Sequence, residues 1–139
     1  MAYASAEEWR AAVGALVDRI ADVDGDGAAD PAAIDRALAE ASAEVDAYVG
    51  VRYPLPLPST PVVLRSATID IATYRLAGGP PVLTDDIRDR YEDAMSRLRD
   101  IAAGRARLDL PQAAHKPPRP VVIKGRPRLF DRGSLGDLV

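Results

Sequence analysis

The chain has 139 residues, a formal net charge of −3 and no cysteine. Its length suits a single domain with a modest core, and the lack of cysteine excludes disulfides, thiolate metal sites and cysteine nucleophiles. No apolar run approaches the roughly 20 residues of a membrane span, and the first residues lack the basic and apolar regions of a signal peptide, so we expect neither feature.

The charge is divided unevenly along the chain. Residues 105–139 contain eight Lys or Arg and three Asp, a net charge of +5, so residues 1–104 must carry −8 to give the total of −3. An acidic body with a basic tail indicates that the tail binds something acidic. That partner is either nucleic acid or the acidic body of a neighbouring copy.

Helical signals begin at Ser5, which forms a capping box with Glu8 and predicts a helix from Ala6. Apolar residues then recur at helical spacing, and Gly14 in their middle predicts two short helices with a break. The apolar positions are Trp9, Val13, Leu16, Val17 and Ile20.

The segment from Asp22 to Asp30 resembles the calcium loop of an EF-hand. Asp22, Asp24, Asp26 and Asp30 occupy loop positions 1, 3, 5 and 9, with a glycine at position 6. Position 12, normally a bidentate Glu, is Ala33, so the loop offers about three or four carboxylate oxygens instead of the six to eight that Ca²⁺ prefers. Two interpretations stay open: a rigid turn between helices, or a weak Ca²⁺ site completed by water or by a partner chain.

A longer helix follows the loop, because Asp30 can cap it and Pro31 suits its first position. Its apolar seam is Ile34, Leu38, Ala41, Val45 and Tyr48, and Gly50 is expected to end it. Prolines alternate through residues 51–61, which predicts an extended polyproline strap held on the helices by Leu55 and Leu57.

The next helix, residues 62–76, is apolar on most sides, with Thr60 predicted to cap it and Pro61 to open it. Such a helix is buried centrally or between subunits. Ile69 and Ile71 point about 200° apart, so we expect one to face the core and the other a second contact. For Asp70, within the apolar seam, we expect an ion pair at a subunit interface.

The last predicted helix is capped by Thr84 and stopped by Gly104. Its seam is Ile87, Tyr91, Ala94, Leu98 and Ile101. The predicted fold is therefore mainly α: a small bundle of four to five helices over residues 1–104, followed by a long extended basic tail over residues 105–139.

Prolines exclude regular helix from much of the tail. Residues 120–124 and 128–130 are short strand candidates, which form either a hairpin or two extended arms. A tail in which basic and apolar residues are interspersed is expected to become ordered on a partner. The predicted partner-binding residues are Val121, Ile123, Arg126, Arg128, Leu129, Phe130, Arg132 and Leu135. Phe130 is the lone aromatic there, which gives little support to base stacking.

Catalytic motifs are absent from the sequence. The single histidine, His115, lies in a proline-rich segment, and there is no Walker loop, GxGxxG or HExxH motif. We therefore expect no enzyme activity, and no cofactor beyond weakly bound Ca²⁺.

Several segments in a fixed order resemble the Mu-like phage head–tail connector family, whose members are also called neck adaptors. These segments are residues 3–9, 22–30, 37–48, 52–56, 69–76, 90–94 and 130–135. The resemblance implies a virion protein that forms a ring, typically of twelve copies, under the portal protein. It also implies that DNA passes through the ring without sequence-specific binding, and that the ring docks the next neck or tail component. The main alternative is a free-standing calcium-binding helical module built on the Asp22–Asp30 loop.

Overall fold

The computed structural model describes residues 1–78 and 81–110, and these are mainly helical. The elements are α1 (Ala6–Val13), a 3₁₀ turn η1 (Gly14–Leu16), α2 (Val17–Ala21), α3 (Pro31–Val49), α4 (Val62–Ala77) and α5 (Asp85–Ala103). The described ranges contain no strand, which confirms the predicted class of a small helical bundle. No helix among them is both long and apolar enough to cross a membrane.

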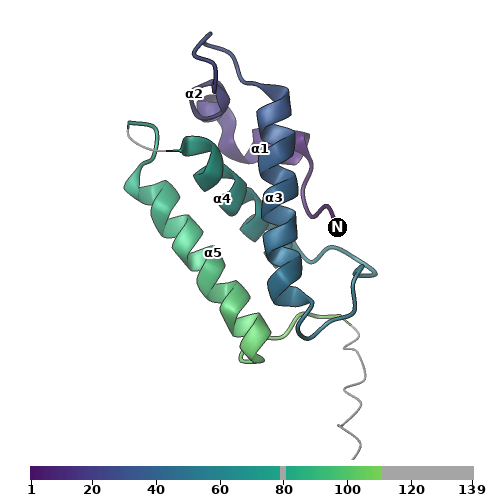
Figure 1. The fold of residues 1–139 in the computed structure, drawn as a ribbon. Helices are drawn as coiled ribbons and strands as arrows, with labels where there is room; N and C mark the ends of the chain where they lie inside the picture. Colours follow the sequence, from purple (N-terminus) through teal and green to yellow (C-terminus); the bar gives the residue numbers. More distant parts are fainter. Residues whose placement is uncertain (79–80, 111–139) are drawn as a thin grey trace, which may run out of the picture.

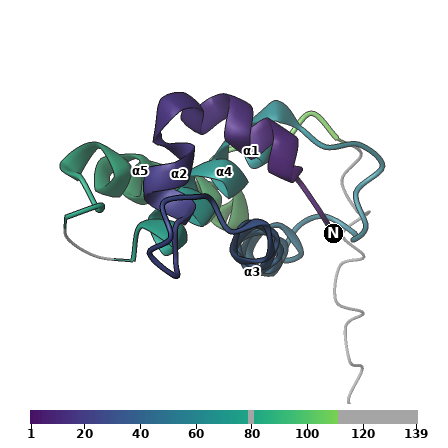
Figure 2. The same ribbon diagram turned by 90° about the horizontal axis from the view of Figure 1, so that it is seen from above.

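Helix α4 lies at the centre of the bundle (Figures 1 and 2). It contacts each of the other four helices, with α3 and α5 on one side and the α1–α2 corner on the other. The expectation of a centrally buried helix is therefore confirmed. The apolar side chains of α4 pack against other helices of the same chain, so they are not all available for a subunit interface.

Most predicted helix ends are confirmed by their hydrogen bonds. Ser5 and Glu8 form the reciprocal capping box, and Gly14 interrupts the first helix with φ of 64°. The Asp30 carboxylate accepts from the Ala32 amide, and the Thr84 hydroxyl accepts from Ile87. The apolar seams of α3 and α5 are buried except for Tyr48 and Tyr91, which are partly exposed.

Three predictions about the strap between α3 and α4 are wrong in detail. The cap of α4 is Pro61 and not Thr60, because the Pro61 carbonyl accepts from the amides of Leu64 and Arg65 while Pro61 keeps an extended backbone. The strap is a series of turns and bends rather than an extended polyproline segment. Leu57 is buried as expected, but Leu55 is 41% exposed.

The buried residue that anchors the strap is Tyr53, which the sequence analysis did not single out. Its hydroxyl accepts from the Leu108 amide at 2.8 Å, and the Leu108 side chain is itself buried. One residue earlier, the Arg52 guanidinium donates to the carbonyls of Ala102 and Ala103 at the end of α5, both at 3.1 Å. Residues 105–110 therefore lie against the body, and the division of the chain at residue 104 stays a prediction.

The two isoleucines of α4 face different neighbours. Ile71 is fully buried in the core, whereas Ile69 is partly exposed beside the α1–α2 corner. Ile71 is thus the isoleucine that faces the core, and Ile69 is the one that is free to make a second contact.

Replacing Ile71 with Ala should lower the free energy of unfolding by about 2–5 kcal/mol, because it leaves a cavity in a closely packed core. Val62 on the same helix is 74% exposed, so Val62→Ala is the matched control and should change stability by less than about 0.5 kcal/mol. Thermal and urea unfolding of the two variants measures both values. Equal losses would contradict the central position of Ile71.

Candidate functional site

The acidic loop between α2 and α3 brings three of its four predicted ligands together. Carboxylate oxygens of Asp22, Asp24 and Asp26 lie within 4.8 Å of one another, with Asp22 half-buried and the other two exposed. Asp30 is not part of this cluster, because its carboxylate caps α3. The loop can therefore present three clustered side chains to a cation, fewer than a complete Ca²⁺ shell requires.

Backbone amides already occupy much of this carboxylate cluster. The two oxygens of Asp22 accept from Gly25 at 2.7 Å and from Gly27 at 3.0 Å. Asp26 accepts from the Ala28 amide at 2.8 Å. Gly25 and Gly27 adopt φ of 80° and 88°, a conformation that glycine takes without strain. These bonds make the loop a self-supporting turn, and Ca²⁺ binding stays a proposal.

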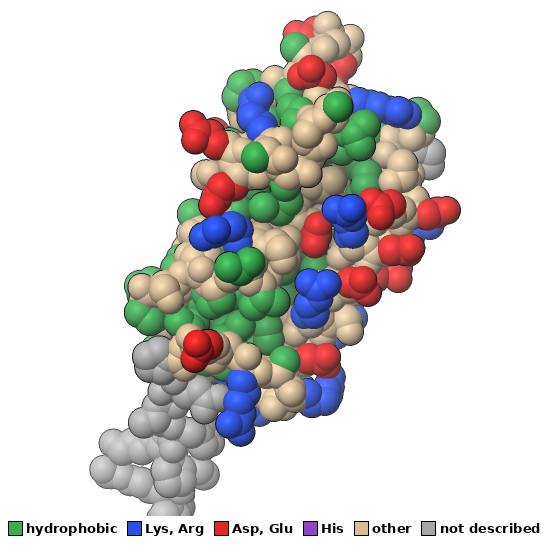
Figure 3. Space-filling model, turned by 180° about the vertical axis from the view of Figure 1, so that it is seen from behind, with side chains coloured by type: hydrophobic (Ala, Val, Ile, Leu, Met, Phe, Trp, Pro, Cys, Tyr) green, Lys and Arg blue, Asp and Glu red, His purple; other side chains and the backbone are tan. Residues whose placement is uncertain are grey.

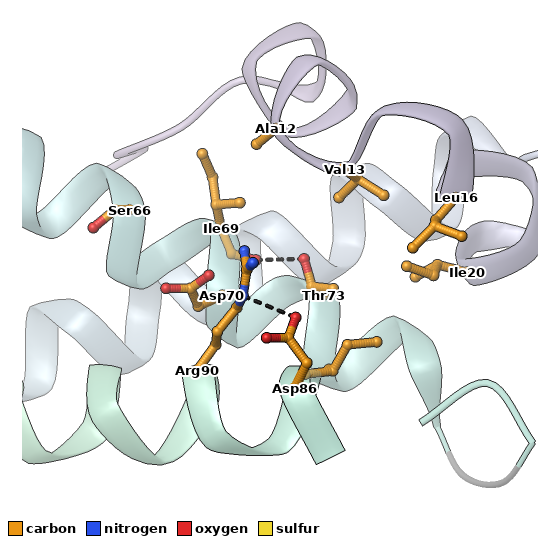
Figure 4. A pocket seen from close by; sticks show the side chains of 11 residues that line it. Ala12, Val13, Leu16, Ile20, Ser66, Ile69, Asp70, Thr73, Asp86 and Arg90 are labelled. Carbon is orange, nitrogen blue, oxygen red and sulfur yellow. Dashed lines mark hydrogen bonds and ion pairs between the residues drawn. The ribbon is translucent and has the colours of Figure 1, made fainter. Parts of the chain in front are cut away.

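A second feature is a groove between the α1–α2 corner, α4 and the start of α5 (Figure 4). It encloses about 390 Å³. One wall is apolar, formed by Val13, Leu16 and Ile69, and Leu16 is 48% exposed. Asp70 and Arg90 point into the groove from α4 and α5. The groove thus offers apolar contact area beside charged groups.

The charged groups of the groove are unequally paired. Arg90 forms an ion pair of 3.0 Å with Asp86. Asp70 has no cation within ion-pair distance among residues 1–78 and 81–110. Burial raises the pKa of its carboxyl, and the more distant Arg90 and Arg97 oppose that shift. The carboxylate of Asp70 would therefore be stabilised by a cation brought into the groove.

The back wall of the groove is held by a polar contact. The Trp9 indole donates to the Thr73 hydroxyl at 3.0 Å, and that hydroxyl donates to the Ile69 carbonyl at 2.8 Å. Because Trp9 is completely buried, this bond fixes α1 on α4. This contact therefore holds α1, which contributes Ala12 and Val13 to the groove, against α4.

Acidic side chains gather along the edge of the molecule formed by α5 (Figure 3). The first half of α5 exposes five acids: Asp85, Asp86, Asp89, Glu92 and Asp93. Only Arg88 and Arg90 offset them there. Hydrophobic side chains cover the middle of the same face. An acidic edge beside an apolar surface suits a partner that is basic and apolar.

Sequence patterns indicate only part of this groove. They predict a second contact for Ile69 or Ile71 and an ion pair for Asp70. Val13 and Leu16 are predicted only as apolar positions of the first helices. The break at Gly14 is predicted from the sequence, but its consequence, an exposed Leu16, is not. The predicted partner-binding residues of the tail lie outside the described part of the chain: Val121, Ile123, Arg126, Arg128, Leu129, Phe130, Arg132 and Leu135.

Comparisons with known proteins agree on one family. The family model for Bacteriophage Mu, Gp36 matches residues 3–123. The Mu-like prophage FluMu protein gp36 of Haemophilus influenzae is 40% identical over 81 residues, which are 58% of this chain and 56% of that protein. Gene product J of Escherichia phage Mu is 29% identical over 114 residues, 80% of this chain and 79% of that protein.

Calorimetric titration of the acidic loop with Ca²⁺ is expected to show a Kd no tighter than roughly 10⁻⁴–10⁻³ M, because a Glu is missing at loop position 12. Replacing both Asp24 and Asp26 with Asn should abolish this binding. Asp35→Asn, an exposed acid on α3 outside the cluster, is the control and should leave it unchanged. A Kd of micromolar or below would contradict the weak-site interpretation.

Proposed function

The chain belongs to the Bacteriophage Mu Gp36 family, and from this premise we propose that it is a head–tail connector, a structural adaptor of the phage particle. Copies of the chain form a ring under the portal protein.

 The ring extends the DNA channel of the portal and presents a docking surface to the next neck or tail component.

The observation that carries this proposal is that one chain combines an acidic, partly apolar surface on its body with a basic segment that contains apolar residues. The helical body has an acidic edge on α5 and an open groove with apolar walls. Residues 105–139 are basic, with a net charge of +5, and contain apolar residues between the cations. A chain that carries both surfaces can bind copies of itself as well as other partners.

The remaining parts of the proposal follow from this role. The protein would be a virion component at the junction of head and tail, assembled in the host cytoplasm. The ring is proposed to contain twelve copies, with the portal protein on one side and a neck or tail protein on the other. DNA would pass through its channel without sequence-specific contacts, and no membrane or enzymatic step is involved.

The carboxylate cluster of the acidic loop favours a second candidate, a calcium-binding helical module. Asp22, Asp24 and Asp26 lie close enough together to share one cation. In this alternative the loop is the function, and Ca²⁺ changes the conformation or the partners of a single copy.

Native mass spectrometry and electron microscopy of the full-length chain test the two candidates. We expect a ring of about twelve copies, either for the chain alone or after mixing with the portal protein of the same phage, because the complementary surfaces lie on one chain. A chain that remains monomeric in both samples would contradict the connector. A monomer that changes conformation with Ca²⁺ would favour the module.

Deleting residues 111–139 should leave the helical circular dichroism signal almost unchanged, because α1–α5 and the Tyr53–Leu108 contact all lie before the deletion. Ring formation and docking on the portal should be lost. Deleting only residues 136–139, which follow the predicted partner-binding residues, is the control and should preserve both. Unfolding of the body in the longer deletion would show that the tail completes the monomer core.

A further inference from the structure

The groove beside α4 combines features that select one kind of occupant. Its apolar wall contains Leu16, which is 48% exposed, and Ile69. The Asp70 carboxylate lies beside this wall without an ion-pair partner among the described residues. An occupant that places a cation next to apolar side chains would cover the wall and pair with Asp70 at once.

A segment of this chain has that composition. Residues 121–132 read Val-Val-Ile-Lys-Gly-Arg-Pro-Arg-Leu-Phe-Asp-Arg. They contain four cations and one acid, with apolar residues at 121–123 and at 129–130. The groove and the acidic edge of α5 therefore match this segment in both charge and apolar character.

The geometry of the described chain favours a groove on another copy. The groove lies at the start of α5, whereas the described chain continues for only seven residues beyond the last residue of that helix, and its coloured trace stops on the side of that end (Figure 1). A helix of 19 residues is about 28 Å long. The ten residues 111–120 span at most about 33–36 Å. Residue 121 could reach the groove of its own copy only with the chain almost fully extended along the body.

We propose that the groove binds residues 121–132 of a neighbouring copy, with a basic side chain paired to Asp70 and apolar side chains on Val13, Leu16 and Ile69. This inference rests on the proposed connector function, because it supplies the contact between adjacent copies of the ring. Donor segment and acceptor groove are different surfaces, so the contact is head-to-tail, and such contacts close into rings when the rotation permits.

Cysteine cross-linking of the full-length chain tests this contact, since the natural sequence has no cysteine. One preparation carries Leu16→Cys, a second carries Phe130→Cys, and the two are mixed under oxidising conditions. We expect a covalent dimer that contains one chain of each kind. Val51→Cys replaces Leu16→Cys in the control, because Val51 is 68% exposed but lies outside the groove, and it should give little cross-link.

A single chain that carries both Leu16→Cys and Phe130→Cys distinguishes a contact between two copies from a contact within one copy. Cross-links between chains support the proposal. Cross-links found only within one chain, at every protein concentration, would overturn it in favour of a segment folded back on its own body. The absence of any cross-link above the Val51→Cys control would also overturn it.

A charge variant provides an independent test. Asp70→Asn keeps the size of the side chain but removes its charge, and we expect association between copies to weaken about tenfold or more. Asp35→Asn on α3 is the matched control and should have no effect. Leu16→Asp provides a second groove variant at an exposed position, in case Asp70→Asn disturbs the fold, and it should weaken association similarly.

The outcomes distinguish this inference from the proposed function. Rings that form normally with both groove variants would overturn the groove contact and leave the connector intact. A chain that forms no ring, alone or with the portal, would count against the connector itself. Weakened rings with the two groove variants, and normal rings with Asp35→Asn, would support the groove contact.

Discussion

The structure depends on the burial of α4 between two layers of helices. On one side α3 and α5 pack against it, and on the other the α1–α2 corner is fixed by the bond from Trp9 to Thr73. Small residues at the contacts, such as Ala67 and Ala72, are fully or almost fully buried and let the helices approach closely. The chain thus builds a core with few aromatic residues, because α4 supplies apolar side chains to both layers.

Local features of the fold could be predicted because they depend on neighbouring residues. The capping box at Ser5, the break at Gly14 and the stop at Gly104 are signals within a few positions, and all three are confirmed. Contacts between distant residues could not be predicted in this way. Tyr3 donates to Asp46 across 43 positions, and Arg52 caps a helix 50 positions away. The residue pattern around Tyr3 or around Arg52 does not indicate which distant residue each of them contacts.

The same distinction explains what was missed at the candidate sites. The spacing of the sequence placed four aspartates in one loop. Asp30 could either join a cation site or cap α3, and in the structure its carboxylate caps α3. The groove joins residues of three separate segments, and its walls exist only after the α1–α2 corner has packed on α4. Apolar spacing could predict that either Ile69 or Ile71 makes a second contact, but it could identify neither which of the two it is nor the residues on the other side.

The contact between Tyr53 and Leu108 fixes the last described residues of the chain on the helical body. In the proposed contact between copies, ten residues of sequence would link this fixed point to the basic segment that begins at residue 121, so the reach of the segment would be bounded. In the proposed ring, when it is nearly complete, the last contact to form would be between two ends already held in one assembly. Its strength is then set by an effective concentration, which reaches about the millimolar range for short tethers. Individually weak contacts can in this way give a stable closed ring, while an isolated pair of copies still separates readily.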